Sequence, residues 1–163
     1  FSRDYPIDRR LASAASAIVE YYRGESYPSA AFTVVATAGL QGVADAVKRI
    51  FAAGVEEPDF GEIQYLAVLE PEHAFFDLKD YLKNITGNGA AKSAYAEFET
   101  ALANAIVAES HTPQIYSALG TGLSGGFFPA DDVCGISSYI PREWLPVTRE
   151  AWYATAWARY VMP

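Results

Sequence analysis

The stretch that most constrains the fold of this chain is residues 133–141, Val-Cys-Gly-Ile-Ser-Ser-Tyr-Ile-Pro. Apolar and polar side chains alternate from Ile136 to Ile140, which is the period of a pleated strand. Pro141 has no amide hydrogen and holds the residue before it in an extended conformation, so the strand should end there. The helices predicted around it each have one apolar face, and each must bury that face. We therefore expect the helices to converge on this strand.

Apolar side chains at helical spacing predict the helices. In the first helix, Asp8 is the expected N-cap, and Leu11, Ala14, Ile18 and Tyr21 recur on one face. The same spacing predicts further helices from Leu40 to Phe51, over 78–85 after a cap at Asp77, over 90–109 and over 148–160 after a cap at Thr148. The helix over 90–109 is expected to be the longest, and the one over 148–160 is rich in tryptophan and tyrosine.

Strand signals are few and widely separated. Short β-branched or aromatic segments at 31–36 and 115–119 join the strand at 136–140, while 120–132 is a loop with four glycines and Pro129. Three such strands cannot complete a sheet, so they either pair with each other or extend a sheet belonging to another segment. The expected class is α+β, helix-rich with about three short strands. The chain divides into a helix-rich part (1–112), a strand, loop and strand (113–141) and the C-terminal aromatic helix (148–160), as one domain over 1–163.

Composition excludes several functional classes. The 163 residues are 51% hydrophobic, which suits a single domain with a real core. A formal net charge of −8 argues against binding to nucleic acid or to an anionic membrane surface, both of which need clustered Lys and Arg. No apolar run is long enough to span a bilayer. The single cysteine rules out an internal disulfide and a cysteine-rich metal site.

Cys134 is the only candidate for a thiol nucleophile. Such a cysteine needs a base within hydrogen-bond reach and surroundings that lower its pKa. Asp131 and Asp132 precede it and would raise the pKa of the thiol, and its only possible bases are His73 and His111. We therefore interpret Cys134 as a structural thiol. His111, expected at the end of the long helix, suits a cation beside the helix C-terminus.

The remaining motifs do not assemble a site. His73 and Asp77 are four residues apart, yet no spacing typical of a metal site occurs, and we expect neither metal nor cofactor. Gly120 to Gly126 lacks the lysine of a phosphate-binding loop and is interpreted as a connection. Asp131-Asp132 does not have the ligand spacing of a calcium loop, and Asn84-Ile85-Thr86 is only a formal glycosylation sequon. The aromatic side chains of 148–160 could form a ligand cage, but core packing explains them more simply.

The order of these elements resembles the C-terminal part of clostripain-family, caspase-like cysteine peptidases of bacteria. The distinctive match is Gly135-Ile136-Ser137-Ser138-Tyr139-Ile140-Pro141, followed by a helix carrying Trp152-Tyr153 and Trp157-Ala158. Further similarity lies in Ile18-Val19-Glu20-Tyr21-Tyr22, in Thr33-Val34-Val35 before Leu40 and Val43, and in Asp77-Leu78-Lys79-Asp80-Tyr81-Leu82. The resemblance covers nearly the whole chain.

The family's catalytic residues stand in "D-A-C" and "H-G" contexts, and neither occurs here: Cys134 follows Val133, His73 precedes Ala74, and His111 precedes Thr112. The resemblance therefore places no catalytic residue on this chain and implies that the Cys-His pair lies N-terminal to Phe1, on a separate chain of the same precursor. It further implies an endopeptidase that cleaves peptide substrates after Arg or Lys, processed into two associated chains and secreted or periplasmic. In that enzyme the present chain would complete a caspase-like α/β sandwich.

Two alternatives stay open. The chain could be a non-enzymatic domain that binds a protein or glycan through a tyrosine-rich surface, since it contains 11 tyrosines. It could also be a self-contained peptidase that uses Cys134 with His73 or His111. The sequence context of these three residues makes the second alternative the weakest of the hypotheses.

Overall fold

A computed structural model describes residues 7–26, 29–60, 63, 75–117, 126–130, 133–141 and 146–162. The helices and strands follow one another as α1 (Ile7–Arg23), β1 (Ala31–Val35), the 3₁₀ turn η1 (Thr37–Gly39), α2 (Leu40–Ala52), β2 (Phe75–Asp77), α3 (Leu78–Asn84), α4 (Gly89–Ala105), β3 (Ile106–His111), β4 (Gln114–Ser117), β5 (Gly126–Pro129), β6 (Ser137–Tyr139), α5 (Pro146–Tyr153) and α6 (Ala156–Val161). The chain therefore mixes helices with short strands, as the α+β prediction requires.

The described strands form three separate antiparallel pairs, β1 with β3, β2 with β6 and β4 with β5. The predicted strands are β1, β4 and β6, and each of them pairs with a strand that the sequence pattern did not reveal. None of the three pairs with another, so the alternative that they pair with each other was wrong. The count of about three strands was too low. β2 lies in a segment without a clear pattern, β3 begins inside the predicted helix 90–109, and β5 lies in the predicted loop 120–132.

The longest predicted helix ends earlier than expected. α4 stops at Ala105, and Ile106 already has an extended backbone (φ −76°, ψ 118°). The prediction of a helix to residue 109 was wrong because Leu102 and Ile106 continue the four-residue spacing. From Ile106 the chain instead pairs with β1, and Val35 lies opposite Ile106. Ladder hydrogen bonds to a distant strand thus override a local helical pattern.

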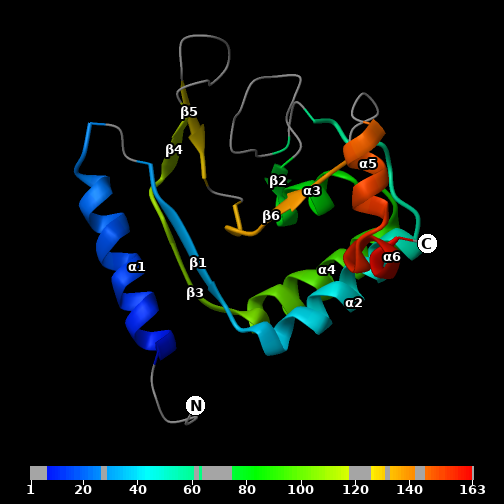
Figure 1. Ribbon diagram of the computed structural model, residues 1–163, viewed down its shortest axis with the longest axis horizontal. Coiled ribbons are helices and arrows are strands. Elements are labelled where there is room, and N and C mark those ends of the chain that lie inside the picture. Colours follow the sequence, from blue (N-terminus) through cyan, green and yellow to red (C-terminus); the bar gives the residue numbers. More distant parts are fainter. Residues whose placement is uncertain are drawn as a thin grey trace.

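The core lies between α2 and α4, which run side by side (Figure 1). Phe98 and Ile50 are fully buried at this contact, and burying a large apolar side chain contributes roughly 1.5–3 kcal/mol. Leu82 and Ile85, at and after the end of α3, and Val161 of α6 join the same cluster. The helices converge on one another rather than on the strand at 136–140, so that expectation was wrong. From residues 133–141, only Cys134 is a buried member of this main cluster.

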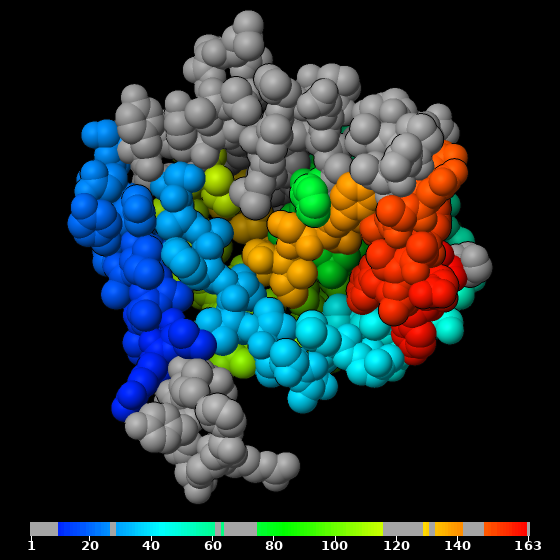
Figure 2. Space-filling model, viewed as in Figure 1, coloured from blue at the N-terminus to red at the C-terminus, as the bar shows by residue number. Residues whose placement is uncertain are grey.

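The buried face of α1 is not the predicted one. Ala15 and Val19 are buried, and α1 packs against β1 and β3. Leu11, Ile18 and Tyr21, which the sequence pattern assigned to the core, are 50%, 40% and 67% exposed. Leu11 lies one helical turn before Ala15, so the exposed larger side chains flank the buried stripe rather than fill it. In the space-filling view α1 forms one edge of the molecule (Figure 2).

The C-terminal aromatic helix predicted over 148–160 is two helices, α5 and α6. α5 begins at Pro146, a residue favoured in the first turn, so Thr148 lies inside the helix and not at its cap. The cap of α6 is Thr155, whose hydroxyl accepts a hydrogen bond from the amide of Ala158 at 3.1 Å. Within the described part of the chain, no helix is long and apolar enough to cross a bilayer.

Candidate functional site

Asp77 and Cys134 form a buried junction between β2, α3 and the segment that leads into β6. Asp77 caps α3 as predicted, with Oδ1 accepting from the amides of Lys79 at 3.0 Å and Asp80 at 3.1 Å. Its Oδ2 accepts from the amide of Cys134 at 2.7 Å. One carboxylate therefore satisfies three backbone donors and fastens residue 134 to the start of α3.

The neighbourhood of Cys134 suppresses its reactivity. Burial and, secondarily, the nearby Asp77 carboxylate raise the pKa of the thiol to about 12. Its Sγ lies 3.8 Å from the carbonyl oxygen of Ile136, which it faces as a weak donor. The carbonyl oxygen of Cys134 accepts from Thr33 Oγ1 at 3.0 Å, which ties the segment to β1. At neutral pH this group is a buried thiol, not a nucleophilic thiolate, as the sequence context indicated.

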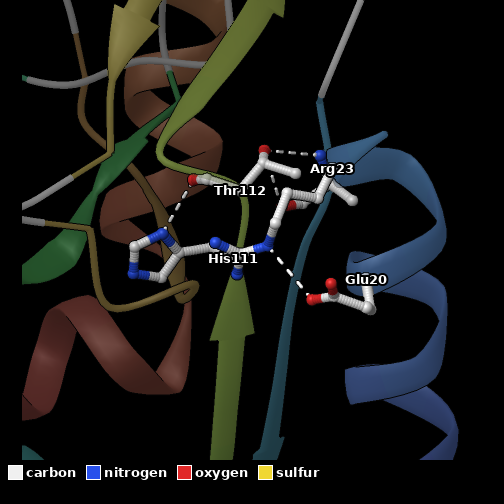
Figure 3. Close-up of polar contacts among 5 residues, drawn as sticks. Glu20, Arg23, His111 and Thr112 are labelled. Atoms are coloured by element: carbon white, nitrogen blue, oxygen red, sulfur yellow. Dashed lines mark hydrogen bonds and ion pairs between the residues drawn. The ribbon is translucent and has the colours of Figure 1, made fainter. Parts of the chain in front are cut away.

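His111 does not lie at a helix end, because the structure places it at the end of β3, opposite Ala31. The expectation that His111 lies as a cation beside the C-terminus of the long helix was therefore wrong. Its Nδ1 contacts the carbonyl oxygen of Thr112 at 2.9 Å, and the ring points away from the Glu20–Arg23 ion pair of α1 (Figure 3). No hydrogen bond joins His111 to Cys134 among the described residues. The two candidate groups therefore do not form a nucleophile and base pair.

The other sequence candidates are accounted for or lie outside the described residues. His73, Asp131, Asp132 and most of the glycine-rich segment 120–126 lie outside them. The strands on either side of that segment, β4 and β5, pair as an antiparallel hairpin, so the segment connects two strands and does not lead into a helix. Among the residues that the structure describes, no group of three acidic, His or Cys side chains could hold a metal ion.

In the formal glycosylation sequon, the side chains of Asn84 and Thr86 form hydrogen bonds to the main chain. The side-chain oxygen of Asn84 accepts from the amide of Asp59 at 2.8 Å. Thr86 is buried, and its hydroxyl donates to the carbonyl oxygen of Lys83 at 2.9 Å. Both side chains therefore hold the end of α3 and the segment that follows α2.

A pocket of about 600 Å³ opens between α2, α3, α5, α6 and the end of β6. Its walls carry the aromatic side chains Phe51, Phe60, Tyr81, Trp152, Tyr153 and Trp157. Its charged lining consists of Glu56, Glu57 and Arg149. Part of the C-terminal aromatic pattern therefore lines a cavity, while Trp157 also packs against the core cluster. The aromatic spacing of the last helices is the sequence signal that could have located this pocket.

Tyr81 marks the electrostatic character of the pocket. Burial, together with the neighbouring Tyr153 and Glu57, raises the pKa of this phenol to about 12. Two phenols and a carboxylate therefore lie near one another in a partly desolvated space. The carboxylate favours positive charge over negative charge at this wall of the pocket, and the faces of the aromatic rings also attract cations.

No model of a known protein family matches the sequence, and no curated protein matches it. Solved structures do match. A cysteine protease of B. fragilis has a TM-score of 0.76 at 22% identity, over 99% of this chain and 67% of its own. An inactive zymogen of a C11 protease from Parabacteroides distasonis has a TM-score of 0.74 at 22% identity, over 93% of this chain and 43% of its own.

A clostripain from Bacteroides thetaiotaomicron, solved with a peptide inhibitor, has a TM-score of 0.72 at 19% identity, over 93% of this chain and 64% of its own. The likeness covers nearly all of the present chain but leaves a large part of each neighbour unmatched. The resemblance seen in the strand-to-proline motif is thus confirmed at the level of the fold. The chain has the fold of one part of the clostripain-family, caspase-like cysteine proteases.

Proposed function

We propose that this chain is the non-catalytic C-terminal part of a clostripain-like cysteine endopeptidase. The observation that carries the proposal is the one-sided coverage: the chain is matched over 93–99% of its length, while the neighbours are matched over 43–67% of theirs. In this proposal the unmatched part of such a protease supplies the catalytic groups. Those groups are the thiolate nucleophile and its histidine base.

The packing of α1 supports an adjoining segment. α1 precedes β1 and packs against the β1–β3 pair, as the connecting helix of a strand–helix–strand unit does. The first strand of such a unit would come from before α1 and would lie parallel to β1. Its addition would widen a sheet of which only β1 and β3 are described here.

The uncovered side of α1 supports the same conclusion. Leu11, Ile18 and Tyr21 form an apolar face that the described part of this chain leaves at least 40% exposed. A contiguous apolar face on a helix marks an interaction surface. In our proposal the N-terminal segment of the same precursor covers it.

The reaction would follow the thiol peptidase scheme. A thiolate from the N-terminal segment attacks the scissile carbonyl, and the histidine gives a proton to the departing amine. Water, deprotonated by the same histidine, then hydrolyses the thioester and regenerates the thiolate. We propose cleavage after Lys or Arg, and the clostripain neighbour supports it, because the peptide part of its inhibitor, VLTK, ends in lysine. A secreted protease from B. thetaiotaomicron among the neighbours supports secretion.

The test uses the precursor that carries this chain. Native mass spectrometry should find the 17.7 kDa chain held noncovalently by a second chain, and the assembly should hydrolyse a peptide aminomethylcoumarin substrate with Lys or Arg at the cleavage site. Cys134→Ala should leave turnover unchanged, whereas replacing the upstream cysteine should abolish it. Turnover that depends on Cys134 would overturn the assignment. A lone folded monomer that is also the complete gene product would overturn it in favour of the tyrosine-rich binding domain.

The outer face of α1 offers a separate test. Leu11→Gln combined with Ile18→Gln keeps good helix formers at exposed positions, so the free energy of unfolding of the isolated chain should change by less than about 0.5 kcal/mol. Burial of these half-exposed side chains against a partner is worth about 1 kcal/mol each, so association should weaken about thirtyfold. Glu99→Gln, on the exposed side of α4, is the matched control. Unchanged association would place the partner elsewhere.

A further inference from the structure

We infer that the aromatic pocket between α2, α3, α5 and α6 binds an alkylammonium group, carried by a lysine side chain or by a small amine. The walls named here come from the described residues of this chain. The inference therefore does not depend on the peptidase proposal, and it can be tested on the chain alone.

The walls have the chemistry that attracts organic cations. Trp152 and Tyr153 of α5 meet edge to face with ring centroids 5.1 Å apart, and Trp157 of α6 and Tyr81 of α3 line the same space. The faces of such rings carry negative charge density and attract an ammonium group within about 6 Å. The pocket volume of about 600 Å³ admits an aliphatic amine with part of its attached chain.

The charges at the pocket select a cation over an anion. Glu56 and Glu57 contribute two carboxylates, whereas Arg149 contributes one cation. Glu57 lies close enough to Tyr81 to help raise the pKa of that phenol, so its charge acts on the aromatic wall. The whole chain, with a net charge of −8, adds to this preference.

Glu56 is held in place by its surroundings. Its amide donates to the carbonyl oxygen of Ile85 at 2.9 Å. Its carboxylate lies against Gly87, in the space that a Cβ on that residue would fill. The main chain of Glu56 is thereby tied to residue 85, and its carboxylate, on an exposed residue, adds negative charge to the pocket lining.

The chain already contains the contact that the pocket would make with its ligand. The ammonium of Lys48 lies 4.7 Å from the centroid of the Tyr160 ring, where α6 meets α2. That phenol donates a hydrogen bond to Asp45, so an aromatic ring, a carboxylate and an ammonium occur together. The pocket presents aromatic rings and carboxylates without a lysine among its lining residues.

The experiment titrates the 163-residue chain with n-butylammonium and with N-acetyl-lysine methylamide at constant ionic strength. Indole N–H shifts of Trp152 and Trp157 report binding by NMR. Saturable shifts with both amines, and none with the neutral Nε-acetylated lysine analogue, are expected. Glu57→Gln should weaken binding about fivefold, through loss of one carboxylate contact, while Glu99→Gln should not change it.

Each outcome decides between alternatives. Lysine amide binding at least tenfold tighter than butylammonium identifies a peptide as the source of the amine, and equal binding identifies a small amine. Binding of the neutral analogue as tight as that of the lysine amide would overturn the inference. Unperturbed indole resonances would overturn it as well, and so would a Glu57→Gln variant with unchanged affinity and a native spectrum.

Discussion

Replacement of Asp77 tests how the junction between α3 and residue 134 is held. This side chain is 7% exposed and accepts three backbone hydrogen bonds, two at the start of α3 and one from Cys134. Asp77→Ala removes all three at once. The buried amide of Cys134 is then left without an acceptor.

The expected cost follows from these contacts. Loss of the N-cap costs about 1 kcal/mol. A buried amide without a partner costs about 1–3 kcal/mol. Asp77→Ala should therefore lower the free energy of unfolding by about 2–4 kcal/mol, which is a large share of the roughly 5–15 kcal/mol typical of a domain. Asp77→Asn keeps the capping oxygen but turns an NH₂ group toward the Cys134 amide. This variant should therefore lose only the about 1–3 kcal/mol that belongs to the unpartnered amide.

Urea unfolding followed by tryptophan fluorescence at pH 7 measures both variants, with Glu99→Gln as the control. The predicted order of stability is wild type, then Asp77→Asn, then Asp77→Ala. A loss below 1 kcal/mol for Asp77→Ala would refute the view that the carboxylate holds the junction. An Asn variant less stable than the Ala variant would refute the assignment of Oδ1 as the capping atom.

The same residue predicts a pH dependence. Burial raises the pKa of Asp77 above its ordinary value of 3.8, even though hydrogen bonds from Cys134 and Asp80 oppose the shift. Between about pH 4 and the raised pKa, the folded state keeps a proton that the unfolded state has lost. The contribution of Asp77 to stability is therefore greatest below pH 4 and falls as the pH rises through that window. The stability of wild type relative to Asp77→Asn should decline over the same interval, and a rise would contradict the sign of the shift.

Three further predictions concern other contacts. With its pKa raised to about 12, Cys134 should react with iodoacetamide at pH 8 at least about a hundredfold more slowly in the folded chain than in urea, and rapid labelling of the folded chain would show a reactive thiol. Gly135→Ala should destabilise the chain by about 1–2 kcal/mol or more, because φ of Gly135 is +69° and the new Cβ would meet the side chain of Thr33 in β1. Gly42→Ala, in open space on α2, should instead stabilise the chain by about 0.5–1 kcal/mol. Equal urea midpoints for the two variants would contradict this difference. Tyr160→Phe should raise the pKa of Asp45, which the phenol now lowers by hydrogen bonding, and an unshifted NMR titration would refute that cause.

Where a local signal and its structural cause lie in the same few residues, the prediction from sequence was accurate. Asp77 caps α3, and Asn88, in the predicted turn, accepts from the amide of Ala91 at 2.8 Å and caps α4. β6 ends at Tyr139, two residues before Pro141, which cannot continue the ladder. The interpretation of Cys134 as a structural thiol agrees with its burial and raised pKa, whereas the absence of a catalytic pair stays a prediction.

Predictions that depended on a distant partner were less accurate. Ile106 continues a helical pattern but lies in β3, because β1 supplies its hydrogen-bonding partner. Leu11 and Ile18 have the spacing of a core-facing stripe, yet Ala15 and Val19 are the buried residues of the helix, which packs on β1 and β3. A periodic pattern identifies an apolar face, but it does not specify which neighbour covers that face.

The sequence by itself determined the helix-rich class, the cap at Asp77, the proline stop and the likeness to one part of a clostripain-type protease, because each depends on residue chemistry at short range. Only the tertiary structure decided the strand pairing, the pocket and the state of Cys134. Each of these brings together residues far apart in the chain, as when Asp77 accepts from Cys134 across 57 residues. Pairing and burial are properties of the surroundings, and the surroundings exist only after the chain has folded.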